Sequence, residues 1–374
     1  MADVQLDDVS CRQEGGGSDK LVLSRVHLYV RDGELLVVVG PSGSGKTTLL
    51  RLIAGLAPVT DGEVRIGGRP VTDLPPRERE VAMVFERDTS HPYLSVGRNL
   101  GLGLEARRFP REEIGKRVSA EARVLRLERV LRWLPGELSA GARRRTSLGR
   151  TLVQVPKVFL LDEPLTHLDA ARRTRLRAEM IRLIKGLGTT TIWVCHDPAE
   201  AMATADRVAV LRDGAITQVD RPRVLYERPR DVFVAAFMDR HAPGPVPARL
   251  VREGGQLCFV VAGQRLALPG PAYGALRPLV GGEITLLPRP EHLHDATHSP
   301  LPGDRRLRAR VRRVHRLGTE TSVICAVGPS TELVATFPPR APVRPGDTVD
   351  IAVDTPRLHI FDPVSGEALH HGSP

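Results

Sequence analysis

The first two thirds of the chain alternate between two hydrophobic periods. From Leu35 to about residue 240, short apolar segments such as LLVVVG, VFLLDE and TTIWVCH alternate with longer stretches whose apolar residues recur at helical spacing. This alternation predicts an α/β domain in which helices cover a parallel sheet. Residues 110–134 are the most continuously helical stretch and contain no strand pattern. We therefore expect a helical subdomain, at about residues 88–155, inserted into the sheet domain.

A change of pattern at residues 241–247 predicts a domain boundary. The prolines and the glycine of HAPGPVP can continue neither a helix nor a strand. Beyond them, segments of alternating polarity such as QLCFVVAGQRLALP and DTVDIAVDTPRLHIF are separated by Gly-Pro and Pro-Gly turns. Such segments are typical of β-strands. We predict an α/β domain over residues 1–240 and a small β-rich domain over residues 241–374.

The composition fits a multidomain globular protein. A chain of 374 residues can form two or three cores. The formal charge of +10 comes almost wholly from arginine, and charge alone is weak support for a polyanionic partner. The four cysteines are scattered without a C-x-x-C pair, which favours a reducing compartment. No apolar run approaches the roughly 18 residues of a membrane span, so we expect a soluble, cytosolic protein that touches membranes only through partners.

The segment GPSGSGKTT has the composition and the context of a phosphate-binding loop. It follows the apolar strand ELLVVV and opens a stretch whose leucines and isoleucine fall on one helical face. Its glycines let backbone N–H groups converge on phosphate oxygens at a helix N-terminus. Lys46 would reach the β- and γ-phosphates, and Thr47 would offer its hydroxyl to Mg²⁺. The predicted nucleotide-binding residues of this loop are Gly40, Pro41, Ser42, Gly43, Ser44, Gly45, Lys46, Thr47 and Thr48.

Acidic and imidazole side chains follow two later apolar strands. KVFLLDEP ends in Asp162 and Glu163, and TTTIWVCHD ends in His196. Because successive side chains of a strand point to opposite faces, one carboxylate can address Mg²⁺, through water, while its neighbour addresses the attacking water. We predict Asp162 for the metal and Glu163 as the general base or water-orienting group. Together with Lys46, the predicted catalytic residues are Glu163 and His196, whose neutral ring would contact the γ-phosphate.

The order of these motifs resembles that of the ATPase subunits of ABC transporters. The phosphate loop is followed by LSAGA, FLLDEP, THLD and CHD, and the resemblance covers essentially the whole chain. It implies that Ser139 and Gly141 form a signature that closes over the γ-phosphate of ATP held by a second subunit. It places Asp169 in a subunit-interface loop and Glu86 near Mg²⁺. It also implies an ATP-sandwich homodimer, with a heterodimer of related ATPases as the alternative.

Other segments resemble one branch of that family. VTDLPPREREVAMVFE, LPRPEHL and PRLHIFDPVSGEAL are similar to carbohydrate importers of the maltose, multiple-sugar and glycerol-3-phosphate type. The resemblance implies a C-terminal OB-like (TOBE) regulatory domain. It also implies two integral-membrane permease subunits at whose cytoplasmic face the ATPase docks, and an extracytoplasmic solute-binding protein that delivers a sugar or related compound. Importers of polyamines, iron and glycerophosphodiesters share much of this pattern, so the solute stays open.

Four places depart from the family pattern. Glu86 stands where a glutamine contacts Mg²⁺ and water, and Gln13 stands where an aromatic residue stacks on adenine. The signature differs from Leu-Ser-Gly-Gly-Gln at Ala140 and Ala142, and THLD (166–169) replaces Ser-Asn-Leu-Asp. The residues that bind phosphate and activate water are all present. We therefore expect a working ATPase that is slow or atypically coupled.

Two other functions are compatible with the sequence. One is an ABC ATPase linked to nucleic acid, suggested by Arg143–Arg145 and by RLRARVRRV (306–314). Binding of single strands uses aromatic platforms, which are scarce beyond residue 250, and the arginines of 306–314 alternate with apolar residues as on the solvated face of a strand. We expect no nucleic-acid partner, and we expect Arg143–Arg145 to face solvent or pair with acids. The other function is a catalytically degenerate or regulatory ABC subunit.

Overall fold

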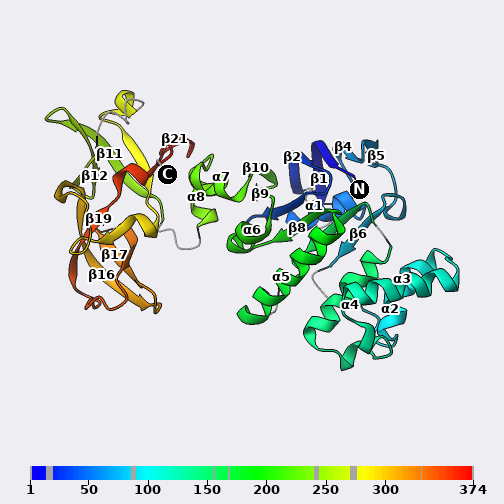
Figure 1. The fold of residues 1–374 in the computed structure, drawn as a ribbon. Coiled ribbons are helices and arrows are strands. Elements are labelled where there is room, and N and C mark those ends of the chain that lie inside the picture. Colours follow the sequence, from blue (N-terminus) through cyan, green and yellow to red (C-terminus); the bar gives the residue numbers. More distant parts are fainter. Residues whose placement is uncertain are drawn as a thin grey trace. The chain divides into compact units, whose positions relative to one another are not determined.

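The computed structural model divides the chain into two compact units, Met1–Pro222 and Arg223–Pro374 (Figure 1). The division by contacts falls after Pro222, whereas the sequence predicts a domain boundary after residue 240. The segment between these two boundaries contains two short helices and is grouped with the second unit by its contacts. The domain boundary at residue 240 stays a prediction. The residues that the structure describes are 2–13, 20–85, 90–154, 156–166, 169–239, 244–269, 276–329 and 331–372.

Two sheets form the body of the first unit. The antiparallel sheet has the order β2-β1-β4-β5 and the larger sheet the order β10-β9-β3-β8-β7-β6. In the larger sheet, β6, β7, β8, β3 and β9 are parallel, and only β10 is antiparallel to its neighbour. The strands are β1 (Val4–Gln13), β2 (Lys20–Val30), β3 (Leu35–Val39), β4 (Asp61–Ile66), β5 (Arg69–Pro70), β6 (Val81–Val84), β7 (Val158–Asp162), β8 (Thr190–Cys195), β9 (Arg207–Arg212) and β10 (Ala215–Asp220).

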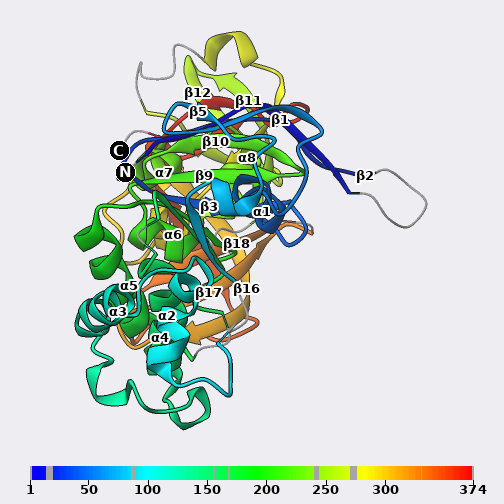
Figure 2. The ribbon, with the colours of Figure 1, turned by 90° about the vertical axis from the view of Figure 1, so that its right-hand side faces the viewer.

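One apolar core joins both sheets to helix α1 (Lys46–Ala54), which Figure 2 shows beside β3. Every residue of β3, β7 and β8 is buried, as expected for parallel strands covered on both faces. Leu49, Leu50 and Ile53 of α1 are fully buried in the same cluster. The predicted α/β fold with a parallel sheet is thus confirmed, and the buried sheet fixes the strand ends that carry the site.

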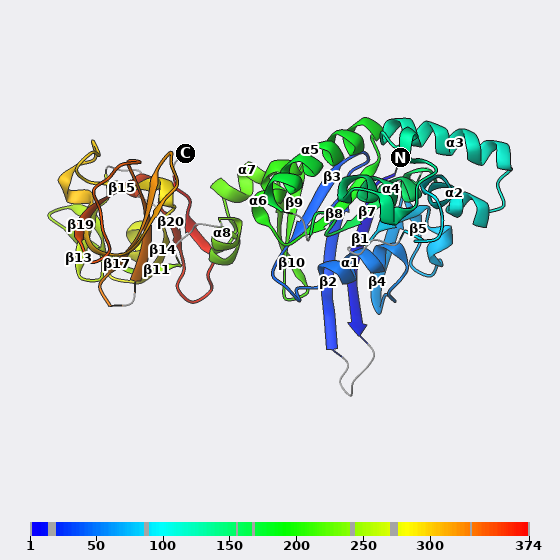
Figure 3. The same cartoon turned by 90° about the horizontal axis from the view of Figure 1, so that it is seen from below.

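Three helices between β6 and β7 form the predicted helical insertion (Figure 3). The stretch 110–134 is not one helix, however, because α3 ends at Val124. Arg126 has a φ of +55°, which no α-helix accommodates, and two 3₁₀ turns follow. Besides α1, the first unit has the helices α2 (Val96–Ala106), α3 (Arg111–Val124), α4 (Ala140–Leu152), α5 (Ala170–Leu187) and α6 (Pro198–Thr204), with η1 (Pro76–Glu78), η2 (Glu128–Val130) and η3 (Pro135–Glu137).

A half-buried glutamate in α3 is expected to make the stability of this insertion depend on pH. Oε1 of Glu121 is buried without a hydrogen-bond partner among the described residues, and burial raises the pKa of Glu121 to about 7. The folded state therefore holds this proton more tightly than the unfolded chain does. The stabilisation is fully present below about pH 4.5 and is lost as the pH rises through about 7.

We expect Glu121→Gln to abolish this pH dependence. A glutamine stays neutral, so relative to wild type it should gain on the order of 2 to 3 kcal/mol of unfolding free energy between about pH 4 and pH 8. Urea unfolding followed by tryptophan fluorescence measures it, because Trp133 and Trp193 both lie in the first unit. Glu112→Gln, on the exposed face of the same helix, is the matched control. Parallel pH profiles for Glu121→Gln and wild type would contradict the assignment.

The second unit contains a six-stranded sheet and a closed five-stranded barrel. The sheet has the order β13-β12-β11-β14-β20-β21 and the barrel the order β15-β18-β17-β16-β19. Helices α7 (Pro222–Glu227) and α8 (Val232–Met238) precede the strands. The strands are β11 (Val246–Glu253), β12 (Gln256–Val261), β13 (Gln264–Ala267), β14 (Glu283–Leu287), β15 (Leu293–Asp295), β16 (Arg306–Arg316), β17 (Thr321–Val327), β18 (Thr331–Phe337), β19 (Thr348–Val353), β20 (His359–Phe361) and β21 (Ala368–His370), with η5 (Pro290–His292), η6 (Gly303–Arg305) and η7 (Thr355–Arg357).

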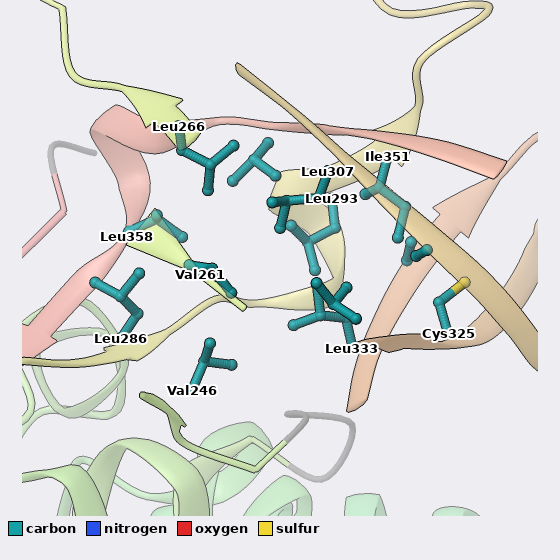
Figure 4. Packing of buried hydrophobic residues seen from close by; sticks show 14 of the residues in the cluster. Val246, Val261, Leu266, Leu286, Leu293, Leu307, Cys325, Leu333, Ile351 and Leu358 are labelled. Atoms are coloured by element: carbon teal, nitrogen blue, oxygen red, sulfur yellow. The ribbon is translucent and has the colours of Figure 1, made fainter. Parts of the chain in front are cut away.

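Sheet and barrel share one apolar core, to which Val261 and Leu286 of the sheet and Leu307 and Leu333 of the barrel contribute (Figure 4). On β16, Leu307, Ala309 and Val311 are buried while the arginines between them are exposed. The basic run of this strand is therefore its solvated face, as its alternation predicts. A closed five-stranded barrel confirms the expected OB-like domain.

Among the described residues of both units, no helix combines the length and the apolar composition needed to cross a bilayer.

Candidate active site

The segment from Gly40 to Gly45 connects β3 to α1 as a tight loop, as its sequence predicts. Gly45 has a φ of +103°, a conformation that side chains rarely adopt. A Cβ atom on Gly40 would lie 2.1 Å from the carbonyl oxygen of Leu211. Both glycines are therefore required by the loop itself, one by its backbone angle and the other by its contact with β9.

The ammonium of Lys46 lies across this loop. Its Nζ donates to the carbonyl oxygens of Gly40 and Pro41 at 2.9 and 2.8 Å. Burial lowers the pKa of Lys46, and the attraction of Glu163 partly opposes this effect. The two carbonyls hold the cation at the loop, where an incoming phosphate can replace them as its partner.

A cavity of about 660 Å³ opens beside the loop. This volume lies in the range of ligand pockets in proteins. Of the predicted residues, Gly40, Pro41 and Ser44 do not line it: Gly40 packs on Leu211, and Ser44 is buried. The predicted residues that do line it are Ser42, Gly43, Gly45, Lys46, Thr47, Thr48 and Glu163.

Four further lining residues were missed by the sequence analysis. Leu21 and Val22 come from the start of β2, and Asp213 and Gly214 form the turn between β9 and β10. The N–H of Gly214 donates to the carbonyl of Ser44, at 3.2 Å, and so ties this turn to the phosphate loop. The Asp-Gly pair signals a tight turn, but nothing in the sequence shows which loop the turn contacts.

Thr47 and Asp162 form the part of the site that suits a hard cation. The Thr47 hydroxyl donates to Oδ1 of Asp162 at 3.0 Å, and Asp162 is buried at the end of β7. The described residues contain no group of three or more His, Cys, Asp or Glu side chains that could hold a metal by themselves. One hydroxyl and one carboxylate nevertheless fit Mg²⁺, which binds few protein oxygens and completes its shell with phosphate and water.

Glu163 leaves the strand rather than continuing it. Its φ of +42° turns the chain directly after β7, and such strained backbone in non-glycine residues is concentrated at functional sites. Strand alternation predicts that Asp162 and Glu163 point to opposite faces of the sheet. The structure separates them by this turn instead, which takes Glu163 to the cavity while Asp162 stays buried.

His196 lies against Glu163, with 3.0 Å between Nδ1 of His196 and Oε2 of Glu163. The His196 side chain is half exposed, whereas the Glu163 carboxylate is largely covered. The predicted catalytic histidine therefore contacts the predicted base, a pairing that the sequence analysis did not foresee. Contact of His196 with a γ-phosphate stays a prediction.

The signature residues lie at the start of α4. Ser139 is the N-cap, and its Oγ accepts from the N–H of Ala142 at 3.2 Å. Neither Ser139 nor Gly141 belongs to the residues that line the cavity, and neither does Asp169. These three residues therefore remain predicted contacts to the nucleotide of a second subunit, with the N-terminus of α4 as the chemical basis for Ser139 and Gly141.

The three consecutive arginines of α4, Arg143–Arg145, have protein partners. Arg145 pairs with Glu179 at 3.4 Å, in agreement with the expected pairing with an acid. Arg143 and Arg144 instead donate to the backbone carbonyls of Pro135 and Phe85. Glu86, with its predicted metal contact, lies outside the described residues, as do His167 and the side chain of Gln13.

The fold and this site define a P-loop ATPase, and comparison with known proteins identifies its family. A family model described as ABC transporter matches residues 23–166, and one described as TOBE domain matches residues 286–361. The sn-glycerol-3-phosphate import ATP-binding protein UgpC of Cereibacter sphaeroides is 41% identical over 99% of this chain and 100% of its own length. The trehalose/maltose import ATP-binding protein MalK of Thermococcus litoralis is 41% identical over 91% and 94%.

A solved structure supports the same assignment. The ATP-binding cassette MJ0796, described as a dimer in a post-hydrolysis state bound to ADP and Pi, is 30% identical with a TM-score of 0.52. The match covers 59% of this chain and 99% of that protein. The chain belongs to the ATP-binding import subunits of ABC transporters that carry a TOBE domain. It is accordingly an ATP-binding ATPase.

Proposed function

We propose that this protein hydrolyses ATP to power the import of a sugar or a related compound through an ABC transporter. The observation that carries the proposal is the convergence of Lys46, Thr47 and Glu163 on one cavity at the phosphate loop. Full-length similarity to import subunits for glycerol 3-phosphate and for trehalose and maltose supports the solute class. A degenerate, non-hydrolysing subunit is disfavoured because all three residues match the motif pattern of ABC ATPases.

Each residue has a defined task in this proposal. The loop N–H groups and Lys46 bind the phosphates, and Glu163 accepts a proton from the attacking water. Thr47 and Asp162 would hold Mg²⁺, whose charge stabilises the phosphate oxygens. His196 moves from Glu163 to the γ-phosphate when the nucleotide binds. Ser139 and Gly141 complete the site of a second copy of the chain, with Asp169 at the interface.

The proposal includes partners outside this chain. We infer a homodimer at the cytoplasmic face of the membrane, held there by two permease subunits, with an extracytoplasmic solute-binding protein as the source of the solute. The dimeric form of MJ0796 supports the homodimer. The solute is selected by the permeases and the binding protein and not by the residues of this site.

Activity of the complete transporter tests the proposal. The chain reconstituted in vesicles with its permeases should hydrolyse ATP in the presence of Mg²⁺, and a solute-loaded binding protein should raise the rate. A panel of trehalose, maltose, glycerol 3-phosphate and a polyamine identifies the solute by stimulation and by its uptake. Chelation of Mg²⁺ should stop hydrolysis. Absence of ATP hydrolysis in the reconstituted complex would contradict an energising role, and stimulation by the polyamine alone would contradict the solute class.

A further inference from the structure

The hydroxyl of Thr166 reaches the carboxylate of the proposed base. Thr166 Oγ1 lies 3.0 Å from Oε2 of Glu163 and 3.0 Å from the carbonyl oxygen of the same residue. The N–H of Thr166 also donates to that carbonyl, at 3.3 Å. The backbone bond closes the turn after Glu163 by itself, so the contact of the hydroxyl with Oε2 is not needed to form the turn.

The two oxygens of Glu163 differ in their surroundings. Oε2 contacts both Thr166 and His196. Oε1 has no hydrogen-bond partner among the described residues, and Glu163 lines the nucleotide cavity. One oxygen is thus held by the protein, and the other is left for a ligand or a water molecule.

The bond from Thr166 becomes more important once His196 leaves. Glu163 and Thr166 belong to one short turn, and the bond between them can persist when other groups move. If His196 turns to the γ-phosphate, Thr166 is the remaining partner of Oε2 among the contacts seen here. Without that hydroxyl the carboxylate would be free to rotate about its side-chain torsions.

We propose that Thr166 is a positioning residue that anchors Oε2 of Glu163 so that Oε1 accepts the proton of the attacking water. This inference rests on the proposed function. In the step, the water oxygen forms a bond to the γ-phosphorus, and the bond from that phosphorus to the oxygen of ADP breaks. One water proton passes to Oε1, and the products are ADP and inorganic phosphate. Thr166 touches neither water nor phosphate and acts only through Glu163.

Three variants of the full chain test this role. Thr166→Val keeps the branched shape and removes the hydroxyl, and we expect kcat to fall about tenfold to a hundredfold because the base is misplaced. The affinity for ATP and the melting temperature should stay near those of wild type. Thr166→Ser should restore kcat, since it keeps the hydroxyl. Thr151→Val, which removes a half-buried hydroxyl bonded to the carbonyl of Leu148, should leave kcat unchanged.

A double variant separates a role through Glu163 from a general structural role. In the Glu163→Gln background, Thr166→Val should cause no further loss of kcat, because residues that act as a unit are not additive. Wild-type kcat in Thr166→Val, no recovery in Thr166→Ser, or a full additional loss in the double variant would each overturn the role of Thr166 while the proposed function stands. A wild type without ATPase activity would contradict the proposed function, and the role of Thr166 would fall with it.

Discussion

Glu163→Gln should lower kcat for ATP hydrolysis by about 10² to 10⁴-fold, because the amide cannot accept the proton of the attacking water. Glutamine has nearly the same shape, and Lys46 and Thr47 stay in place, so ATP should still bind. With hydrolysis blocked, ATP should trap a stable dimer that wild type forms only in passing. The second subunit would contribute Ser139 and Gly141 to each nucleotide.

Steady-state kinetics and size-exclusion chromatography with and without ATP measure the two effects together. Glu128→Gln is the control, since it makes the same exchange at an exposed position in the same unit. An ATPase rate equal to that of wild type would remove Glu163 from the role of base. Loss of hydrolysis without dimer formation would instead contradict the shared nucleotide site.

Arg289→Met should destabilise the second unit by about 3 to 5 kcal/mol, the usual cost of removing one partner from a buried ion pair. Arg289 is 1% exposed and pairs with Asp239 at 3.2 Å. It also donates to the carbonyl of Tyr226, and its guanidinium carbon lies 3.4 Å from the centre of the Tyr226 ring. The Arg289 side chain, just after β14, therefore contacts both α7, through Tyr226, and the residue that follows α8, Asp239.

The position of the tryptophans allows unfolding of the second unit to be distinguished from unfolding of the first. Trp133 and Trp193 both lie in the first unit, so their fluorescence reports its unfolding, while far-UV circular dichroism also follows the strands of the second. In urea, the dichroism of Arg289→Met should show a transition at lower concentration, and the fluorescence transition should change much less. Arg312→Met, at an exposed position on β16, is the control. If the dichroism and fluorescence transitions of Arg289→Met both fell at the urea concentrations of wild type, Arg289 would not stabilise the packing of these helices.

The sequence predicts best those parts of the site that are contiguous in it. The phosphate loop works through its own backbone and the helix that follows, so GPSGSGKTT carries nearly all the information needed. Asp162 and Glu163 are predictable because an apolar strand ends there. Leu21 and Asp213 are not, because their place at the cavity depends on how β2 and the β9–β10 turn pack against the loop. Local spacing does not encode that packing.

Backbone angles account for the other differences. The helical period of residues 110–134 continues past Val124, but Arg126 at a positive φ ends the helix there. Glu163 likewise adopts a positive φ although glutamate has no preference for it. Both conformations are imposed by the surrounding tertiary structure. The pairing of Glu163 with His196 follows from the same turn and has no counterpart in the spacing of the motifs.

The ties between the phosphate loop and its surroundings bear on the entropy of nucleotide binding. Lys46 already bridges two carbonyls of the loop, and Gly214 holds a third at Ser44. The loop therefore has little conformational freedom left to lose when a nucleotide arrives, and preorganisation of this kind raises affinity without adding a contact. Part of the selectivity for phosphate is thus already present in the fold before any ligand enters.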